Sequence, residues 1–348
     1  MPVIAIDCRF ASTPSGLGRY TRELVSHLLQ RDDPLEYVLL IHDDAKDWIT
    51  TLSQSDRWKT HIVRAGHYSI AEHRELPNIF KSIRVDLLFS LHFNVPWSCP
   101  VPFVVTIHDL ILHRYPNAAP FWKRLAYRAL VRHAVLRAQR IITVSTFVQG
   151  EIATFFGPDI SSRIHVIHEG VSPVFRRRSE AEQDRVCRAF GIKRPFFLYV
   201  GNAKQHKNLP LLLQAWEALD ARDSHLVLVT GGPETQRLRL PPRTIRIPHI
   251  DDHDLSALYS AARAFVTPSL YEGFCLPVVE ALACTCPVIA VHGGPLAEVT
   301  QGQALLIEPT IDALRSALQS PPPPPASFHT PCWETAVEKT VDVLKNYC

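Results

Sequence analysis

ARAFVTPS (residues 262–269) runs directly into LYEGFCLPVVEALA (residues 270–283), and this stretch contains a turn from a strand into a helix. Its first part is apolar and ends in a Pro-Ser turn signal, which predicts a short buried strand. Pro277 suits the first turn of a helix, because the N–H group that proline lacks would have no partner there. The stretch therefore predicts a strand, a tight loop and a helix in succession.

Glu272 and Glu280 lie eight positions apart across the start of this predicted helix. Gly273 lets the backbone come close to a ligand, and the N–H groups at a helix start attract phosphate. The two carboxylates would repel phosphate, so we expect them to face hydroxyl groups. A nucleotide sugar carries both a diphosphate and hydroxyl groups. A corner with two solvated glutamates is the alternative interpretation.

Short apolar segments that are typical of strands alternate with helical segments along the whole chain. The first series is VIAIDC (from Val3), YVLLIH (Tyr37), VDLLFS (Val85), FVVTIH (Phe103), RIITVS (Arg140) and RIHVIH (Arg163). After a polar break at residues 176–194, the second series is FFLYVG, HLVLVTGG, TIRIPH, AFVTPS, PVIAV and ALLI. Such strands are buried on both faces, and their alternation with helices indicates parallel sheets. We expect an α/β protein with two Rossmann-like, doubly wound parallel-sheet domains facing a deep cleft.

The polar break suggests a first domain at residues 1–172 and a second at residues 173–332. PPPPP (residues 321–325) predicts a stiff polyproline spacer ahead of a last helix within residues 332–348. The segment 333–348 could pack back on the first domain, and a simple terminal docking helix is the less specific interpretation.

The bulk composition is that of a globular protein, with 46% hydrophobic and 20% charged residues. A net charge of +3 does not indicate a nucleic-acid partner. MPVIAIDCRF does not resemble a signal peptide, and no apolar run reaches the roughly 18 residues of a membrane span, so we expect a cytoplasmic protein. Cys284 and Cys286 have no further ligands at metal-site spacing, which favours buried thiols over a metal site.

Loops that follow the predicted strands carry the other candidate residues, because ligands bind at the carboxyl ends of parallel strands. Gly16 and Gly18 open a helix whose start can meet a diphosphate, although a plain helix entry is equally compatible with this pattern. His108 and Asp109 follow a strand. The histidine can donate to a phosphate or a sugar hydroxyl, and Asp109 can orient its ring or accept from an acceptor hydroxyl.

A basic loop, GNAKQHKN (residues 201–208), follows the strand FFLYV and precedes a helix that Asn208 is expected to cap. Lys204, His206 and Lys207 crowd ahead of that helix, where a cation is disfavoured by the helix dipole. Cations held at a positive helix end indicate that an anion joins them, and we interpret the loop as a diphosphate site. A solvated turn is the alternative.

The segment 121–140 predicts a basic helix with Arg124, Arg128 and Arg132 in one i, i+4 row. Trp122, Leu125 and Ala129 lie on a neighbouring face. We expect a charged solvent face over a stripe that faces the core. Contact with an anionic lipid surface is the other interpretation, because basic amphipathic helices bind such surfaces.

With these motifs assembled, the chain resembles the family 4 retaining glycosyltransferases of the GT-B class over nearly its full length. The second half carries GNAKQHKN, YEGFCLPVVEALACTCPVIA, PLAEV and ALLIEP, and the first half carries SGLGRYTRELV, TIHD, IITVS and IHEGV. The resemblance implies transfer of a hexose from a nucleotide sugar to a glycan or lipid-linked acceptor, without a bound metal or other cofactor. The chain is similar to members that use GDP-mannose. This resemblance also implies polysaccharide or glycoconjugate synthesis, with peripheral contact at the inner membrane face.

By position, the resemblance implies that Glu272 lies near the donor sugar and diphosphate and that Glu280 binds the ribose hydroxyls. It implies catalytic roles for Glu272, His108 and Lys207, and an acceptor-side position for Asp109. The donor-binding residues that it implies are Gly16, Gly18, Gly201, Asn202, Lys204, Lys207, Gly273, Phe274, Cys275, Leu276 and Glu280. One position departs from the family pattern: Asn202 stands where an arginine is common, so Lys204 would have to supply part of the charge.

Two other functions are compatible with parts of the sequence. Asn202 in place of arginine favours a non-catalytic GT-B protein that binds a sugar nucleotide as a sensor or partner subunit. Parallel sheets alone would also suit a nicotinamide oxidoreductase, but the chain lacks G-x-G-x-x-G and a suitably placed acid for the ribose.

Overall fold

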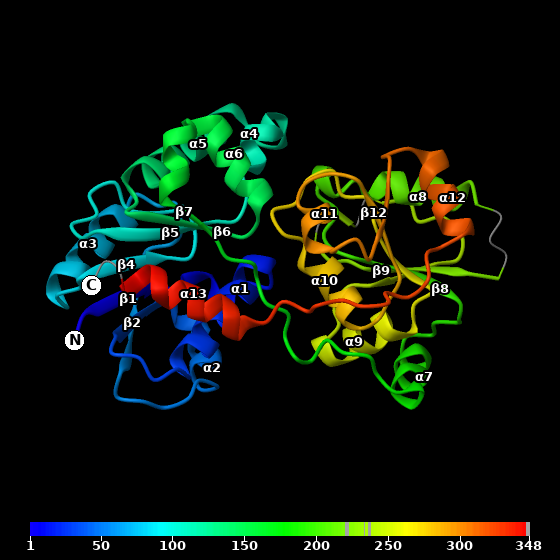
Figure 1. Cartoon of the computed structure of the whole chain (residues 1–348), viewed down its shortest axis with the longest axis horizontal. Coiled ribbons are helices and arrows are strands. Elements are labelled where there is room, and N and C mark those ends of the chain that lie inside the picture. Colours follow the sequence, from blue (N-terminus) through cyan, green and yellow to red (C-terminus); the bar gives the residue numbers. More distant parts are fainter. Residues whose placement is uncertain (220–222, 233, 236–237, 346–348) are drawn as a thin grey trace. The chain divides into compact units, whose positions relative to one another are not determined.

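The computed structural model describes residues 1–219, 223–232, 234–235 and 238–345. The chain divides into two compact units. Unit 1 comprises Met1–Gly170 and the C-terminal segment that begins at Cys332, and unit 2 comprises Val171–Pro331. Each unit has its own parallel sheet and its own apolar core (Figure 1).

The sheet of unit 1 has seven parallel strands within the described residues, in the order β3-β2-β1-β4-β5-β6-β7. They are β1 (Val3–Asp7), β2 (Glu36–Ile41), β3 (Trp58–Ile62), β4 (Leu87–Ser90), β5 (Phe103–Ile107), β6 (Arg140–Thr143) and β7 (Ile164–Val166). Ala5 on β1 lies opposite Val38 on one side and Leu88 on the other. The strand order reverses between β1 and β4, and ligands of open parallel sheets bind at the carboxyl side of such a switch point.

Helices cover both faces of this sheet, as the repeated β-α alternation requires. They are α1 (Gly16–Leu29), α2 (Lys46–Ile49), α3 (Glu72–Ser82), α4 (Ile111–Arg114), α5 (Phe121–Arg137), α6 (Thr146–Phe156) and α13 (Trp333–Lys345). The C-terminal α13 packs beside α1 (Figure 1). Its Trp333 is fully buried, with its ring 5.7 Å from that of Tyr20. The last described helix is therefore part of the core of unit 1.

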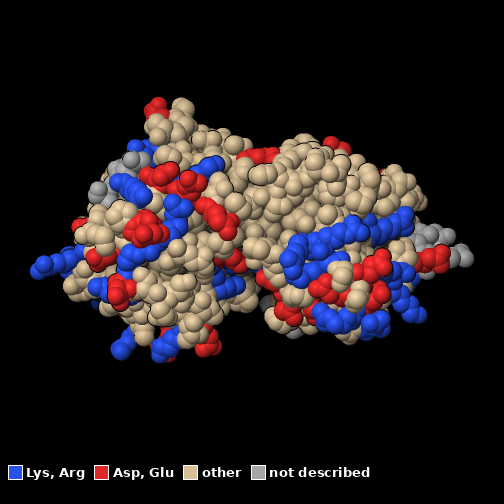
Figure 2. Space-filling model, turned by 60° about the horizontal axis from the view of Figure 1, so that its bottom comes forward, with Lys and Arg blue, Asp and Glu red and all other residues tan. Residues whose placement is uncertain are grey.

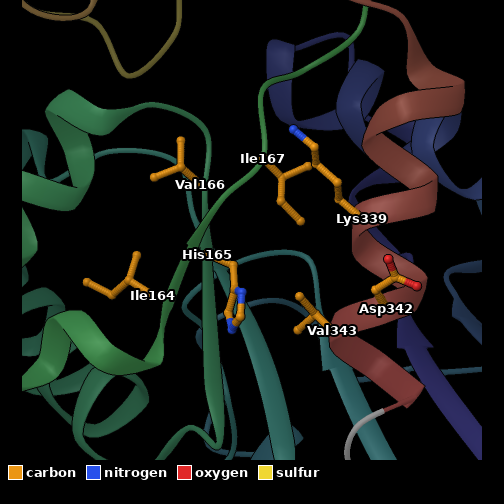
Figure 3. Close-up of a pocket in the computed structure, with 7 residues that line it drawn as sticks. All are labelled: Ile164, His165, Val166, Ile167, Lys339, Asp342 and Val343. Atoms are coloured by element: carbon orange, nitrogen blue, oxygen red, sulfur yellow. The ribbon is translucent and has the colours of Figure 1, made fainter.

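The edge strand β7 also lies near α13, and a cavity of about 390 Å³ separates the two. Figure 3 shows Ile164, His165, Val166 and Ile167 on one side and Lys339, Asp342 and Val343 of α13 on the other. Since β7 is at the far edge of the sheet, this cavity is remote from the switch point between β1 and β4.

The sheet of unit 2 has six parallel strands within the described part, in the order β10-β9-β8-β11-β12-β13. They are β8 (Phe196–Val200), β9 (His225–Val229), β10 (Thr244–Ile247), β11 (Ala264–Thr267), β12 (Val288–Val291) and β13 (Leu305–Ile307). Phe265 on β11 lies opposite Leu198 on β8 and Val288 on β12. The switch point of this sheet therefore lies between β8 and β11.

The helices of unit 2 are α7 (Glu180–Ala189), α8 (Leu209–Glu217), α9 (Asp252–Ala261), α10 (Leu276–Ala283), α11 (Leu296–Val299) and α12 (Ile311–Gln319). A capping box of Ser179 and Glu182 starts α7, which packs on α9. Arg194 forms an ion pair with Asp184 of α7, and both side chains are exposed. Figure 2 shows basic and acidic side chains interspersed on the face turned forward, so the positive charges there have acidic neighbours.

All twelve strands predicted from the sequence are confirmed, with ends that differ by a few residues. One strand, β3, was not predicted, because WKTHI is polar and its side chains are only partly buried at the sheet edge. The basic helix was predicted to reach residue 140, but α5 ends at Arg137 and Arg140 begins β6. Within the described residues, no helix combines the length and the apolar character that crossing a bilayer would require.

The expected capping role of Asn208 is wrong. Asn208 occupies the N-cap position of α8, but its backbone is left-handed (φ +51°) and its side chain makes no capping hydrogen bond. Pro277 lies in the first turn of α10, as predicted, and Pro210 has the same place in α8.

Candidate functional site

The loops after β8 and β11 meet at the switch point of the unit 2 sheet. The backbone N–H of Leu270 donates to the carbonyl of His206 at 2.8 Å, and the Ser269 hydroxyl donates to the same carbonyl at 3.3 Å. These bonds join the basic loop to the segment that leads into α10. Because β8 and β11 are adjacent parallel strands, the two loops leave the same edge of the sheet.

Lys207 and Glu272 form the central contact of this site. The Lys207 Nζ donates to both carboxylate oxygens of Glu272, at 2.7 and 2.8 Å. The side chains are 20% and 11% exposed, so the pair is shielded on most sides but still open to a ligand. From the sequence, Lys207 is expected to bind a diphosphate and Glu272 is expected to lie near the donor sugar. In this structure the Lys207 ammonium group is bound by the Glu272 carboxylate.

The start of α10 lies beside this ion pair. Cys275 occupies the N-cap position with φ +77°, a left-handed conformation that residues other than glycine seldom adopt. Its side chain makes no capping bond, and the first turn of any helix leaves backbone N–H groups without intrahelical partners. Phe274 and Cys275 are buried, so a ligand at this loop would meet backbone more than side chain. Burial, with the nearby Glu272 carboxylate, raises the pKa of the Cys275 thiol, which therefore stays protonated at neutral pH.

Glu280, the second acidic residue of the motif, lies inside α10 and is buried. The hydroxyl of Tyr259 on α9 donates to its Oε2 at 3.2 Å. The two glutamates of the motif thus differ in setting: Glu272 is held by a cation at the loop, and Glu280 is held by a phenol within the helix pair.

The first part of the basic loop is shaped by Tyr199, the penultimate residue of β8. Its hydroxyl donates to the carbonyl of Asn202 at 2.6 Å, and the backbone N–H of Lys204 donates to the Asn202 side chain at 3.2 Å. Gly201 leaves room for this phenol, because an added Cβ would lie 3.1 Å from the Tyr199 oxygen. Lys204 itself is exposed. Asn202 therefore shapes the loop, and Lys204 is the cation nearest to it in sequence.

In unit 1, His108 and Asp109 follow β5 as predicted, but the ring is oriented by a residue that the sequence analysis did not single out. The His108 Nε2 donates to the carbonyl of Leu91 at 3.0 Å, and its Nδ1 lies 3.3 Å from Glu169 Oε1. Asp109 instead accepts from the N–H of Ile111 at 3.0 Å, at the start of α4. Both ring nitrogens of His108 are thus engaged within unit 1. Only the stretch IHEGV hinted at Glu169.

Gly16 and Gly18 open α1, where Ser15 caps the helix by accepting from the Gly18 N–H at 3.2 Å. The two glycines have different surroundings. An added Cβ at Gly16 would meet nothing within 4 Å, whereas one at Gly18 would lie 2.0 Å from the backbone oxygen of Thr13. Gly18 is therefore required for close packing, and Gly16 is open to solvent.

We expect Gly18→Ala to destabilise the protein by about 2 kcal/mol or more, because the Thr13 backbone must move. Gly16→Ala should leave stability unchanged or raise it by up to about 1 kcal/mol, since alanine is the better helix former. Thermal denaturation of both variants checks this pair. Equal stability of the two would contradict the packing role of Gly18.

Within the described part of the chain, no three His, Cys, Asp or Glu side chains are grouped as metal ligands would be. Cys284 and Cys286 are buried free thiols, as predicted.

Two family descriptions match the chain, one for each half. "Glycosyltransferase Family 4" matches residues 14–175, and "Glycosyl transferases group 1" matches residues 182–321. Two Rossmann-like units, each with a parallel sheet, are the architecture of the GT-B class. The chain belongs to the family 4 glycosyltransferases of that class.

Known proteins that the chain is similar to include O-antigen chain mannosyltransferase B of Escherichia coli, with 33% identity over 61% of this chain and 58% of that protein. O-antigen chain mannosyltransferase RfbU of Salmonella typhimurium is 29% identical over 59% of this chain and 56% of that protein. The matches thus span little more than half the length of these relatives.

Solved structures share the fold. Sucrose-phosphate synthase from Thermosynechococcus elongatus aligns with a TM-score of 0.70 and 19% identity, over 100% of this chain and 95% of that one. WaaG, a glycosyltransferase involved in lipopolysaccharide biosynthesis, aligns with a TM-score of 0.67 and 15% identity, over 99% of this chain and 94% of that one. Anabaena HepE, solved in complex with UDP and glucose, aligns with a TM-score of 0.70 and 15% identity, over 99% of this chain and 97% of that one.

Proposed function

We propose that this protein transfers a hexose, with mannose as the first choice, from a nucleotide sugar to a glycan or lipid-linked acceptor. Retention of the anomeric configuration and independence from a bound metal are part of the proposal. The observation that carries it is the Lys207–Glu272 pair beside the start of α10, at the switch point of a Rossmann-like sheet. The mannosyltransferases among the relatives support the choice of mannose and a role in polysaccharide synthesis.

The proposed chemistry follows from charge. The bond between the anomeric carbon and the diphosphate oxygen breaks, which leaves negative charge on the diphosphate and positive charge on the sugar ring. Lys207, Lys204 and the N-terminal end of α10 stabilise the departing diphosphate electrostatically. The acceptor hydroxyl oxygen then bonds to the anomeric carbon from the same face, and its proton passes to the departing phosphate.

Lys207 must exchange partners during this cycle. In this structure its ammonium group is bound by Glu272. When a diphosphate arrives, the same ammonium group can turn to the phosphate oxygens, which releases the Glu272 carboxylate toward the hydroxyl groups of the donor sugar. Glu280, which Tyr259 holds, is assigned to the ribose hydroxyls.

Acceptor-dependent release of a nucleoside diphosphate tests the proposal. A thermal-shift panel of nucleoside diphosphates first identifies the donor base, and turnover is then measured with and without EDTA. We expect release only when an acceptor is present, unchanged turnover in EDTA, and a product whose anomeric configuration matches the donor by NMR. Binding of a sugar nucleotide without any turnover would favour the non-catalytic alternative. Loss of activity in EDTA that Mg²⁺ restores would contradict metal independence.

We also propose that the protein acts at the cytoplasmic membrane face, with α5 as the contact. Phe121, Trp122 and Leu125 at the start of α5 are largely exposed, although the sequence analysis expected Trp122 and Leu125 to face the core. The helix sequence contains five Lys or Arg residues and no Asp or Glu. Lys123 and Arg124 lie over the exposed rings of Trp122 and Phe121, at 5.3 and 5.2 Å. Exposed aromatic side chains among cations suit an anionic lipid surface.

We expect the protein to sediment with phosphatidylglycerol vesicles and much less with phosphatidylcholine vesicles, and added salt should weaken this binding. The double variant Phe121→Ser, Trp122→Ser should reduce the bound fraction at least about fivefold, because each aromatic side chain buries a large apolar surface. Ile70→Ser, which alters an exposed apolar residue that is not part of α5, is the matched control. Equal sedimentation of the double variant and the unaltered protein would contradict the contact.

A further inference from the structure

Aromatic and imidazole rings that are not assigned to the donor gather at the switch point of the unit 1 sheet. Phe10 follows β1, His67 and Tyr68 follow β3, and His92 and Phe93 follow β4. We call these five residues the His67 cluster. Phe10 stacks on His67 with ring centroids 3.6 Å apart and planes 16° from parallel, and His92 lies 5.0 Å from Phe10. The loops of three strands thus converge on one set of rings.

A rigid, negatively charged base supports the cluster. The Arg9 side chain is 0% exposed and donates to Asp7 at 2.7 and 2.8 Å and to Glu72 at 3.0 Å. Asn94 donates to Glu72 at 3.0 and 3.1 Å. Two carboxylates around one guanidinium leave one net negative charge. Buried groups that are paired in this way hold a fixed geometry.

His67 has hydrogen-bonding capacity that the protein satisfies only in part. Within the described structure neither of its ring nitrogens makes a hydrogen bond of standard geometry, and the Arg9 backbone is the group that interacts with the ring. Desolvation, with the charge of Arg9, lowers the pKa of His67 to about 4, so the ring is neutral at pH 7. A neutral imidazole has one donor and one acceptor, and a sugar hydroxyl can satisfy either. An unsatisfied buried polar group is costly, so a hydroxyl that reaches this ring gains affinity.

Tyr68 places a ring at the surface of the cluster. It is 52% exposed, and its φ of +60° is unusual for a residue other than glycine. Its hydroxyl lies 3.4 Å from His92 Nδ1. Desolvation raises the pKa of Tyr68, and the carboxylates of Glu72 and Asp109 add to this. Asp109 is therefore a further negative charge near the exposed ring.

We propose that the His67 cluster binds the sugar of the acceptor that receives the hexose, and that it selects an uncharged sugar over one bearing phosphate or carboxylate. This inference rests on the proposed transfer activity. Ligands of open parallel sheets bind at switch points, and the switch point of unit 2 is assigned to the donor. A flat ring at the surface suits the apolar face of a sugar, and the imidazoles suit its hydroxyl groups.

The selectivity follows from charge. Asp7, Glu72 and Asp109 face Arg9, whose donors are already committed to carboxylates and a backbone carbonyl. His67 is neutral, so it adds no positive charge. A phosphate placed here would meet like charges in a partly desolvated site, where repulsion is stronger than in water. An uncharged sugar carries no such penalty.

The test is a glycan array with neutral oligosaccharides, the same oligosaccharides carrying phosphate, and oligosaccharides ending in a uronic acid. The full-length protein is applied with the nucleoside diphosphate that gives the largest thermal shift. We expect neutral glycans to bind at least tenfold better than their phosphorylated or uronic acid counterparts. Equal binding, a preference for charged glycans, or no glycan binding at all would overturn the inference.

Tyr68→Gly should reduce the glycan signal at least tenfold. Glycine adopts a φ of +60° without strain, so this variant removes the ring and keeps the local backbone. Trp97→Ala is the matched control, because Trp97 is 50% exposed and packs on His133, outside the cluster. Normal glycan binding by Tyr68→Gly would overturn the inference.

The nucleoside diphosphate thermal shift, measured on the same samples, separates the two proposals. If glycan binding fails while the thermal shift is retained, only the acceptor assignment falls. If no nucleoside diphosphate shifts the protein, the donor proposal falls as well.

Discussion

Lys207→Ala should weaken nucleoside diphosphate binding roughly 10- to 100-fold, because a charge-assisted hydrogen bond to phosphate contributes about 1.5–3 kcal/mol. Turnover should fall by a further 100- to 1000-fold or so, since the lost charge acts mainly on the departing diphosphate. Calorimetry with the nucleoside diphosphate and steady-state kinetics measure the two effects separately. A larger loss in kcat than in affinity is the signature of a group that stabilises the transition state.

Lys193→Ala is the matched control for this variant. Lys193 is an exposed lysine that precedes β8, whereas Lys207 follows β8. The two lysines therefore lie beyond opposite ends of the same strand. Both changes remove one positive charge from unit 2. If Lys193→Ala weakened the nucleoside diphosphate as much as Lys207→Ala, the effect would be one of net charge, and the site assignment would be contradicted.

Glu272→Gln should reduce transfer about 1000-fold while nucleoside diphosphate binding is retained or becomes tighter. The loss is expected because Glu272 is assigned to the donor sugar, where it acts as charge develops on the ring. The gain in affinity is expected because Lys207 then lacks the carboxylate that binds it at 2.7 Å in this structure. The two variants of this ion pair are thus expected to change nucleoside diphosphate affinity differently: Lys207→Ala lowers it, and Glu272→Gln retains or raises it.

Glutamine keeps the shape of the side chain, so unfolding is not expected, and thermal denaturation verifies this. Glu217→Gln is the control, since Glu217 is an exposed carboxylate at the end of α8. Near-normal turnover by Glu272→Gln would remove Glu272 from the chemistry. Weaker nucleoside diphosphate binding by this variant would mean that Glu272 holds Lys207 in position for the ligand. It would contradict the expectation that Glu272 competes with the ligand for Lys207.

Local pattern was enough to predict most of the fold. Segments such as LLFS in β4 and VIAV in β12 are apolar throughout because both faces of a parallel strand are covered, and this can be read without coordinates. WKTHI in β3 was missed because an edge strand lies partly in solvent and its polar side chains hide the pattern. Trp122 and Leu125 were assigned to the core because periodicity shows which residues share a face, but not which face meets solvent.

The residue types of the donor site, a lysine after β8 and a glutamate after β11, could be identified in the sequence by their places after predicted strands. Their contact could not, because it depends on β11 pairing directly with β8, which is a matter of strand order. The same holds for Glu169 beside His108, 61 residues away, and for Glu72 beside Arg9, 63 residues away. Helices, strands and turns follow from interactions within a few residues, which the sequence specifies directly. Which charges meet follows from packing between distant segments, and only the tertiary structure decided that.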